Sequence, residues 1–371
     1  MTPDDAAAAW LARIPESERL AAAAATDWRL AGWAAGWAIG LAACALVARS
    51  GLLRRIRDRL EANRPRPWLT SAACAGVLAA AVGGAMALTA AAFAAWVGAD
   101  ASLGARLGAA ASQTVAVAVL VPPVHWLMRR RPGAWPFVLG PLVAVLILAV
   151  GWLPYVAGGG AGLPIAPPSP AQAGVLRLVA ETHLPASDVR LSPDPAFDAD
   201  VTGGFGRATV VLGPVLAAGR PAEARAYVGH LMGHYVHEDI LAVCLLLGAS
   251  LFLGMLAARR WAAPLARALG ARDAADAADP LSLPGVALLG LTTVIVAGLV
   301  AAAYLRWANV RADAYSLDHA REPDGLAAVI EREWDRQAVD PSPLAEAVFY
   351  THPPLAERLR QAMAWKAAHG G

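Results

Sequence analysis

Six long apolar runs, none of them interrupted by a charged residue, dominate this sequence. A helix needs roughly 20 apolar residues to cross the hydrocarbon core of a bilayer. All six runs have about that length. We therefore expect an α-helical membrane protein with about six transmembrane helices, at residues 30–48, 69–97, 107–128, 135–155, 240–258 and 281–305.

Composition supports this class. Of the 371 residues, 57% are hydrophobic and 16% are charged, whereas soluble domains average about 45–50% apolar and about 25% charged residues. These values exclude an ordinary soluble domain and a disordered chain. The formal net charge of +2 indicates no basic surface for nucleic acid, so we expect no nucleic-acid partner. Membrane lipid is the expected surrounding.

The loops between the runs differ in arginine content. Arg-rich segments follow the first, third and fifth runs, as in 49–66, 129–131 and 259–272. Cytoplasmic loops carry the excess of basic residues, which predicts that these three loops are cytoplasmic. The polar segments 156–239 and 306–371 then share the opposite, extracytoplasmic face.

These boundaries divide the chain into five predicted parts. Residues 1–29 read as an amphipathic surface segment, 30–155 as four transmembrane helices, and 240–305 as two more. The two polar segments, 156–239 and 306–371, are expected to form one small α+β domain.

Local patterns predict the elements of this domain. A helix is expected over 171–181, and the β-branched run 208–212 between glycines predicts a strand or hairpin edge. From Pro221 one helix is expected to run through a group of histidines into the fifth transmembrane helix. Three more helices are expected at 310–319, 325–335 and 355–369.

The histidine group contains the most informative spacing. His230 and His234 are four residues apart, so both imidazoles project from one face of a helix and can point at one metal ion. In zincins this pair belongs to the motif H-E-x-x-H, in which the Glu activates a zinc-bound water. The Glu position is Leu231 here. The pair alone is a weak signal, because histidines at a membrane edge are often unrelated interfacial residues.

Several further motifs stand in order around the pair. The core H-L-M-G-H-Y-V begins at His230, D-A-D-V-T-G begins at Asp198, R-A-D-A begins at Arg311, and H-P-P-L-A-E-R begins at His352. Together they resemble the type I CAAX prenyl endopeptidases and their relative HtpX, a family of membrane zinc metallopeptidases. The resemblance covers about residues 129–360 and implies a zincin-like domain. It also implies that run 208–216 is the edge strand over a peptide substrate, which makes Thr209 and Val210 candidate substrate-binding residues.

The sequence departs from the family pattern at the positions that would bind zinc, activate water and contact the substrate. The general-base position is Leu231, the glutamate-ligand position is Asn309, and the asparagine that would contact the substrate backbone is Asp198. Leucine cannot take a proton from water, and an amide oxygen is a poor zinc donor. The resemblance therefore implies a degenerate zinc motif, with zinc bound weakly or not at all.

Three side chains are candidates to replace what is lost. Asp313, one turn after Asn309, is a weak candidate ligand, although the family's aspartate here more often orients the site. Asp198 is a candidate base. His352 approaches the active site in the family, but a His before Pro-Pro can equally fix a turn, and we favour the structural role.

These observations leave two functions open. The first is a peptidase-like protein with impaired hydrolysis that keeps a cavity for a peptide or a membrane-protein partner. The second is an active zinc metalloendopeptidase with a rearranged site that uses Asp313 and Asp198. A channel or transporter finds no support, because no charged residue lies within a run. The alanine- and arginine-rich composition indicates a bacterial inner membrane.

Overall fold

The computed structural model describes residues 2–96, 102–157, 163–164, 169–184, 186, 189–204 and 207–370. The chain divides into two compact units. Unit 1 contains residues 1–26, 144–247 and 298–371, and unit 2 contains residues 27–143 and 248–297. Each unit therefore combines segments that lie far apart in the sequence.

Six helices are long and apolar enough to cross a membrane, as the sequence predicts. Within unit 2, large apolar side chains on these helices point outward, for example Leu120 and Leu253, each 63% exposed. Such surfaces suit lipid rather than water. The six are α2 (Glu16–Arg49), α4 (Pro67–Trp96), α5 (Leu103–Arg130), α6 with η1 and α7 (Trp135–Val156), α11 (Asp239–Leu269) and η2 with α12 (Pro280–Ala320).

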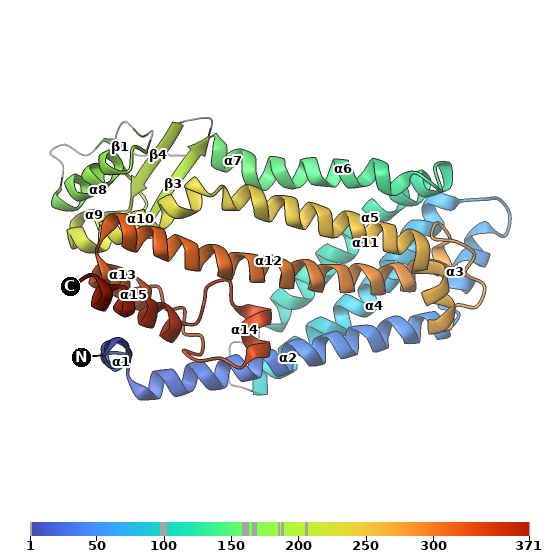
Figure 1. Cartoon of the computed structure of the whole chain (residues 1–371). Coiled ribbons are helices and arrows are strands. Elements are labelled where there is room, and N and C mark those ends of the chain that lie inside the picture. The colour runs from blue at the N-terminus through green and yellow to red at the C-terminus, as the bar shows by residue number, and fades with distance from the viewer. Residues whose placement is uncertain are drawn as a thin grey trace. The chain divides into compact units, whose positions relative to one another are not determined.

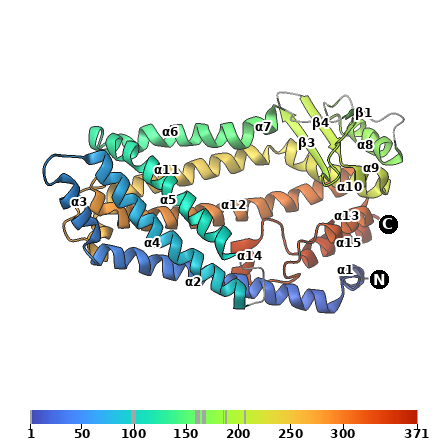
Figure 2. The same cartoon turned by 180° about the vertical axis from the view of Figure 1, so that it is seen from behind.

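Unit 2 is built around the antiparallel neighbours α4 and α5, which lie side by side in both views (Figure 1 and Figure 2). Its buried core contains Cys44, Cys74 and Leu78. The short helix α3 (Leu52–Glu61) follows α2 through Gly51, whose φ of 66° needs the conformational freedom of glycine. Unit 2 therefore contains the C-terminal ends of α2 and α11 together with α3.

Unit 1 contains a small sheet with helices packed on it. The strands are β1 (Leu163–Pro164), β2 (Val189–Leu191), β3 (Ala199–Gly204) and β4 (Arg207–Leu212), in the order β1-β2-β4-β3. β3 and β4 form an antiparallel hairpin, with Thr202 opposite Thr209. Leu178 of α8 (Pro170–Glu181) and Val228 and Met232 of α10 (Pro221–Val236) complete the core beneath it.

The strand order corrects one expectation. β4 pairs with β2 on one side and with β3 on the other, so it is internal, and β3 is the edge strand. Val210 is fully buried in the core. The run 208–212 is therefore a strand, as predicted, but it is not the edge, and the helix α9 (Pro214–Ala218) follows it.

Helix α10 ends earlier than the sequence predicts. It stops at Val236, Glu238 adopts a φ of 52°, and α11 begins at Asp239. The expected single helix from Pro221 into the membrane is thus two helices. The left-handed residue turns the chain, so Asp239 does not continue the α10 helix face.

The remaining helices of unit 1 also differ from expectation. α12 runs from Leu283 to Ala320, so the predicted span and the helix at 310–319 are one element, followed by α13 (Pro323–Arg332), α14 (Pro343–Phe349) and α15 (Leu355–His369). The segment 1–29 is not a separate surface element. Its α1 (Pro3–Leu11) packs Ala7 and Trp10 against Leu359 and Met363 of α15, near both termini (Figure 1).

Candidate active site

Two glycines bring α10 and α12 into close contact. A Cβ atom on Gly233 would lie 2.8 Å from the Cα atom of Ala312, and one on Gly229 would lie 3.0 Å from the hydroxyl of Ser316. Only hydrogen side chains leave room for this approach. Because both pairs are spaced by four residues, the contact extends over one turn and places the histidine side chains of α10 against the polar residues of α12.

Three acceptor atoms meet where the helices cross. Nε2 of His230 lies 3.2 Å from Nε2 of His234, and the latter lies 3.2 Å from Oδ1 of Asn309. The two rings are nearly perpendicular, with centroids 4.8 Å apart. The sequence prediction that these histidines share one face is realised in this arrangement.

The Nδ1 atom of each histidine forms a hydrogen bond with a carboxylate. Nδ1 of His230 lies 2.7 Å from Oδ1 of Asp313, and Nδ1 of His234 lies 2.8 Å from Oδ2 of Asp239. A carboxylate only accepts, so each Nδ1 carries the proton and donates it. In a neutral imidazole the Nε2 atom then presents a lone pair, and burial lowers the pKa of His230 and so favours that neutral form.

The orientation of the Asn309 amide is fixed by its donors. Its Nδ2 donates to the carbonyls of Leu305, at 2.9 Å, and Thr351, at 3.1 Å. Oδ1 therefore faces His234 as a third acceptor. Three lone pairs at this spacing repel one another unless a cation or a single proton lies among them, so the arrangement has the chemistry of a cation site.

The spacing of the two imidazole nitrogens fits zinc, but the donor set is weak in charge. Two nitrogens on a tetrahedral zinc, with bonds of about 2.0–2.1 Å, lie about 3.3 Å apart, close to the 3.2 Å between the imidazole Nε2 atoms. Within the described residues, no three His, Cys, Asp or Glu side chains are grouped to hold a metal. The third donor here is the neutral amide oxygen of Asn309.

Asp313 has other partners than a metal. Arg358 on α15 donates to both of its oxygens, from Nε at 2.7 Å and from Nη2 at 2.8 Å. Both side chains are buried, Asp313 to 1% and Arg358 to 6% exposure. Asp313 thus contacts His230 on one side and Arg358 on the other, an arrangement in which it can orient His230, one of the two roles that the sequence left open.

Asp239 is a site residue that sequence reasoning missed. Tyr304 donates to its Oδ1 at 2.7 Å, and Arg311 donates to the same atom. It reaches His234 because the chain turns at Glu238. Its position five residues after a motif histidine was the available signal, but a continuous helix would have carried it away from that ring.

Two cavities open onto the histidines, and both are lined by Leu231, His234 and His352. The first has a volume of about 490 Å³ and also includes His230 and Glu333. The second has a volume of about 860 Å³, and its wall is largely apolar. That wall comes mainly from η1 (Leu148–Trp152), α11 and neighbouring residues, including Val150, Ile240, Val243 and Leu247.

The other predicted site residues lie in different settings. His352 is exposed at the cavities, and its ring stacks on that of His230 at a centroid distance of 6.4 Å. Asp198 lines neither cavity and instead lies 4.0 Å from Arg332. The acidic residues that do line them are Glu333 and Asp335 in the smaller and Asp200 and Asp239 in the larger. Burial raises the pKa of Glu333 and of Asp200.

Comparison with known proteins agrees with this geometry. The model of peptidase family M48 matches residues 170–366, more than half of the chain. No curated protein sequence matches. Among solved structures, the crystal structure of S. mikatae Ste24p is similar with a TM-score of 0.52 and 15% identity, over 78% of this chain and 76% of that one.

The solved structure supports the fold, six membrane-spanning helices with a small α+β domain, and the family model covers the histidines, Asn309, Asp313 and Arg358. The predicted resemblance to the HtpX and CAAX-type metallopeptidases is confirmed. The chain belongs to peptidase family M48, as a membrane-spanning metallopeptidase-like protein.

Proposed function

We propose that this protein is an M48 peptidase-like protein whose hydrolytic activity is impaired and whose cavity still binds a peptide or partner. The observation that carries the proposal is Leu231, which lines both cavities beside His234, at the position where the family has its base. A hydrocarbon side chain cannot accept a proton from water. General acid–base assistance is typically worth about 10²- to 10⁴-fold in rate.

Zinc would be held by His230, His234 and Asn309, and when bound it would supply a Lewis acid for a peptide carbonyl or water. Asp313 and Asp239 keep the two Nδ1 protons in place and so aim both Nε2 lone pairs at one point. Because the third donor is neutral, we expect weak occupancy. Asn309→Glu should raise the zinc content of purified protein toward one per chain, as measured by elemental analysis.

The proposed peptide site lies along the edge of β3. β3 is the last strand in the sheet order, so one of its edges has no neighbouring strand among the residues that the structure describes. Its residues Asp200 and Val201 line the larger cavity together with His234. An extended peptide can add to such an edge through main-chain hydrogen bonds. We therefore propose that a substrate would contact β3 rather than Thr209 and Val210 of β4.

The alternative, an active enzyme, has one supporting observation. Asp200 and Glu333 each place a carboxyl group on a cavity wall. Asp313 and Asp198 are weaker candidates for this role, since Arg358 and His230 occupy the first and Arg332 pairs with the second. Of the other acids on the cavity walls, Asp239 accepts from His234 and Asp335 accepts from Gln337, so an active site would use Asp200 or Glu333 as the base.

Peptide cleavage separates the two functions. Wild-type protein should cleave a library of unstructured quenched-fluorescence peptides no faster than His230→Ala. Leu231→Glu combined with Asn309→Glu should produce metal-dependent cleavage, about 10²- to 10⁴-fold above Asn309→Glu alone. Chelator-sensitive cleavage by the wild type that His230→Ala abolishes would overturn the proposal. Asp200→Asn and Glu333→Gln would then identify the base.

We further propose that the protein lies in a bacterial inner membrane with the histidine domain outside the cytoplasm. The three Arg-rich loops support this orientation through the positive-inside rule, and the alanine- and arginine-rich sequence supports the bacterial origin. Alkaline phosphatase fused after Lys366 should be active. A silent fusion, paired with a fluorescent cytoplasmic reporter at the same residue, would reverse the orientation.

A further inference from the structure

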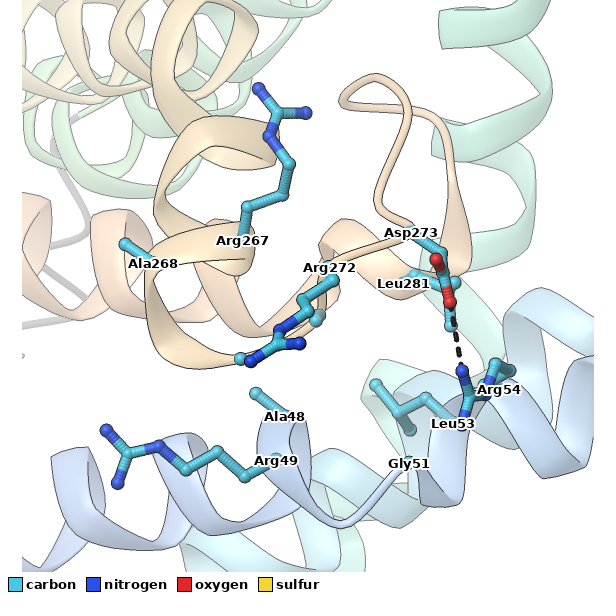
Figure 3. Close-up of a pocket in the computed structure, with 12 residues that line it drawn as sticks. Ala48, Arg49, Gly51, Leu53, Arg54, Arg267, Ala268, Arg272, Asp273 and Leu281 are labelled. Atoms are coloured by element: carbon cyan, nitrogen blue, oxygen red, sulfur yellow. Dashed lines mark hydrogen bonds and ion pairs between the residues drawn. The ribbon is translucent and has the colours of Figure 1, made fainter.

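Unit 2 contains a polar pocket that the histidine chemistry does not use. It has a volume of about 580 Å³. Figure 3 shows that it forms between the end of α2 and the start of α3 on one side and the end of α11 with its following loop on the other. We call it the arginine pocket, after its lining residues Arg49, Arg54, Arg267 and Arg272.

Charge in the arginine pocket is not balanced. The lining contains four arginines and one carboxylate, Asp273, which pairs with Arg54 at 3.2 Å. Arg267 donates to the carbonyl of Ala274 at 2.7 Å, which holds the side chain but does not neutralise it. For Arg49 and Arg272, the described part of the chain offers no carboxylate partner. The pocket therefore keeps a formal excess of positive charge.

A close approach at Gly270 shapes this pocket. Gly270 has a φ of 118°, and a Cβ atom there would lie 2.5 Å from Cγ of Arg49. The loop after α11 thus lies directly against the end of α2. Ala48, Leu53 and Leu281 form a buried apolar floor below the arginines. Basic side chains and a buried apolar floor therefore line the same pocket.

We propose that the arginine pocket binds the phosphate-bearing headgroup of an anionic membrane phospholipid. Guanidinium groups present paired N–H donors that match phosphate oxygens. The pocket lies at the ends of α2 and α11, both of which are long and apolar enough to span a membrane. Basic pockets between transmembrane helices recognise lipid headgroups in this way. The apolar floor suits the glycerol and first acyl carbons of the same lipid.

Binding can be measured on the full-length protein in detergent micelles by titration with short-chain phosphatidylglycerol, followed by the change in thermal unfolding temperature. Short-chain phosphatidylcholine and inorganic phosphate serve as parallel ligands. The double variant Arg49→Gln/Arg272→Gln should bind phosphatidylglycerol about 30-fold more weakly, because each arginine near the surface contributes about fivefold. Arg272→Glu provides a single-residue variant should the double variant fail to fold.

The matched control is Arg59→Gln/Arg64→Gln, which removes the same charge from exposed residues that do not line the pocket. Its affinity should stay within about twofold of the wild type. Equal loss in both double variants would mean that diffuse charge attracts the lipid, and no loss in either would mean that the pocket is not the site; both results overturn the proposal. Inorganic phosphate binding as tightly as phosphatidylglycerol would also overturn it, in favour of a site for the free anion.

Discussion

The histidine site of unit 1 and the arginine pocket of unit 2 differ in whether their charged side chains are paired. In the first, Asp313 is matched by Arg358 and His230, and Asp239 by Arg311, Tyr304 and His234. In the second, Arg49 and Arg272 lack a carboxylate partner within the described residues. The difference is between charges that support the fold and charges available to a ligand.

Burial explains why the two regions differ. A buried ion that loses its partner keeps the full cost of desolvation, whereas an exposed ion is solvated by water. Asp313 and Arg358 are buried, and the four pocket arginines are exposed. Substitutions should therefore be costly to folding in unit 1 and cheap in unit 2, and the following predictions test that contrast.

The largest effect is expected from Arg358→Met, which leaves the Asp313 carboxylate buried without its bidentate partner. We expect the free energy of unfolding to fall by about 3–5 kcal/mol, measured by denaturant unfolding in mixed micelles. Arg360→Met is the control, because Arg360 forms an exposed pair with Asp4 at 3.2 Å and should cost less than about 1 kcal/mol. Equal effects in the two variants would show that burial does not govern the first pair.

A smaller effect, on zinc affinity, is expected from Asp239→Asn, which weakens the hydrogen bond to Nδ1 of His234. Groups that orient a metal-bound histidine typically contribute about 10- to 100-fold in metal affinity. The measurement is zinc titration by calorimetry in the Asn309→Glu background. Asp318→Asn, an exposed aspartate that accepts from Trp365 at 2.9 Å, should leave the affinity unchanged. Unaltered binding in Asp239→Asn would mean that Asp239 does not orient His234 for the metal.

The sequence predicts those features of both regions that depend on local periodicity. Length and hydropathy locate the membrane helices, and the four-residue spacing places His230 and His234 on one face. The spacing of Gly229 and Gly233 against Ala312 and Ser316 is visible in the sequence only once the two helices are known to pack.

The features that the sequence does not predict depend on tertiary packing. The turn at Glu238 follows no glycine or proline, so nothing local indicates that Asp239 returns to His234. Strand order depends on which edges pair in space, which is why β4 reads as an edge strand and is internal. The Asn309 amide takes its orientation from the carbonyl of Thr351, 42 residues away in the sequence.

The smallest effect on folding is expected from Arg49→Gln/Arg272→Gln. Both side chains are exposed and lack a carboxylate partner in the described chain, so the free energy of unfolding without added lipid should change by less than about 0.5 kcal/mol. Denaturant unfolding in uncharged detergent measures this value. A loss of 2 kcal/mol or more would show that these arginines support the fold as Arg358 does, and the contrast between the two regions would fail. Stability near the wild-type value, together with weaker lipid binding, would mean that their charge serves a ligand.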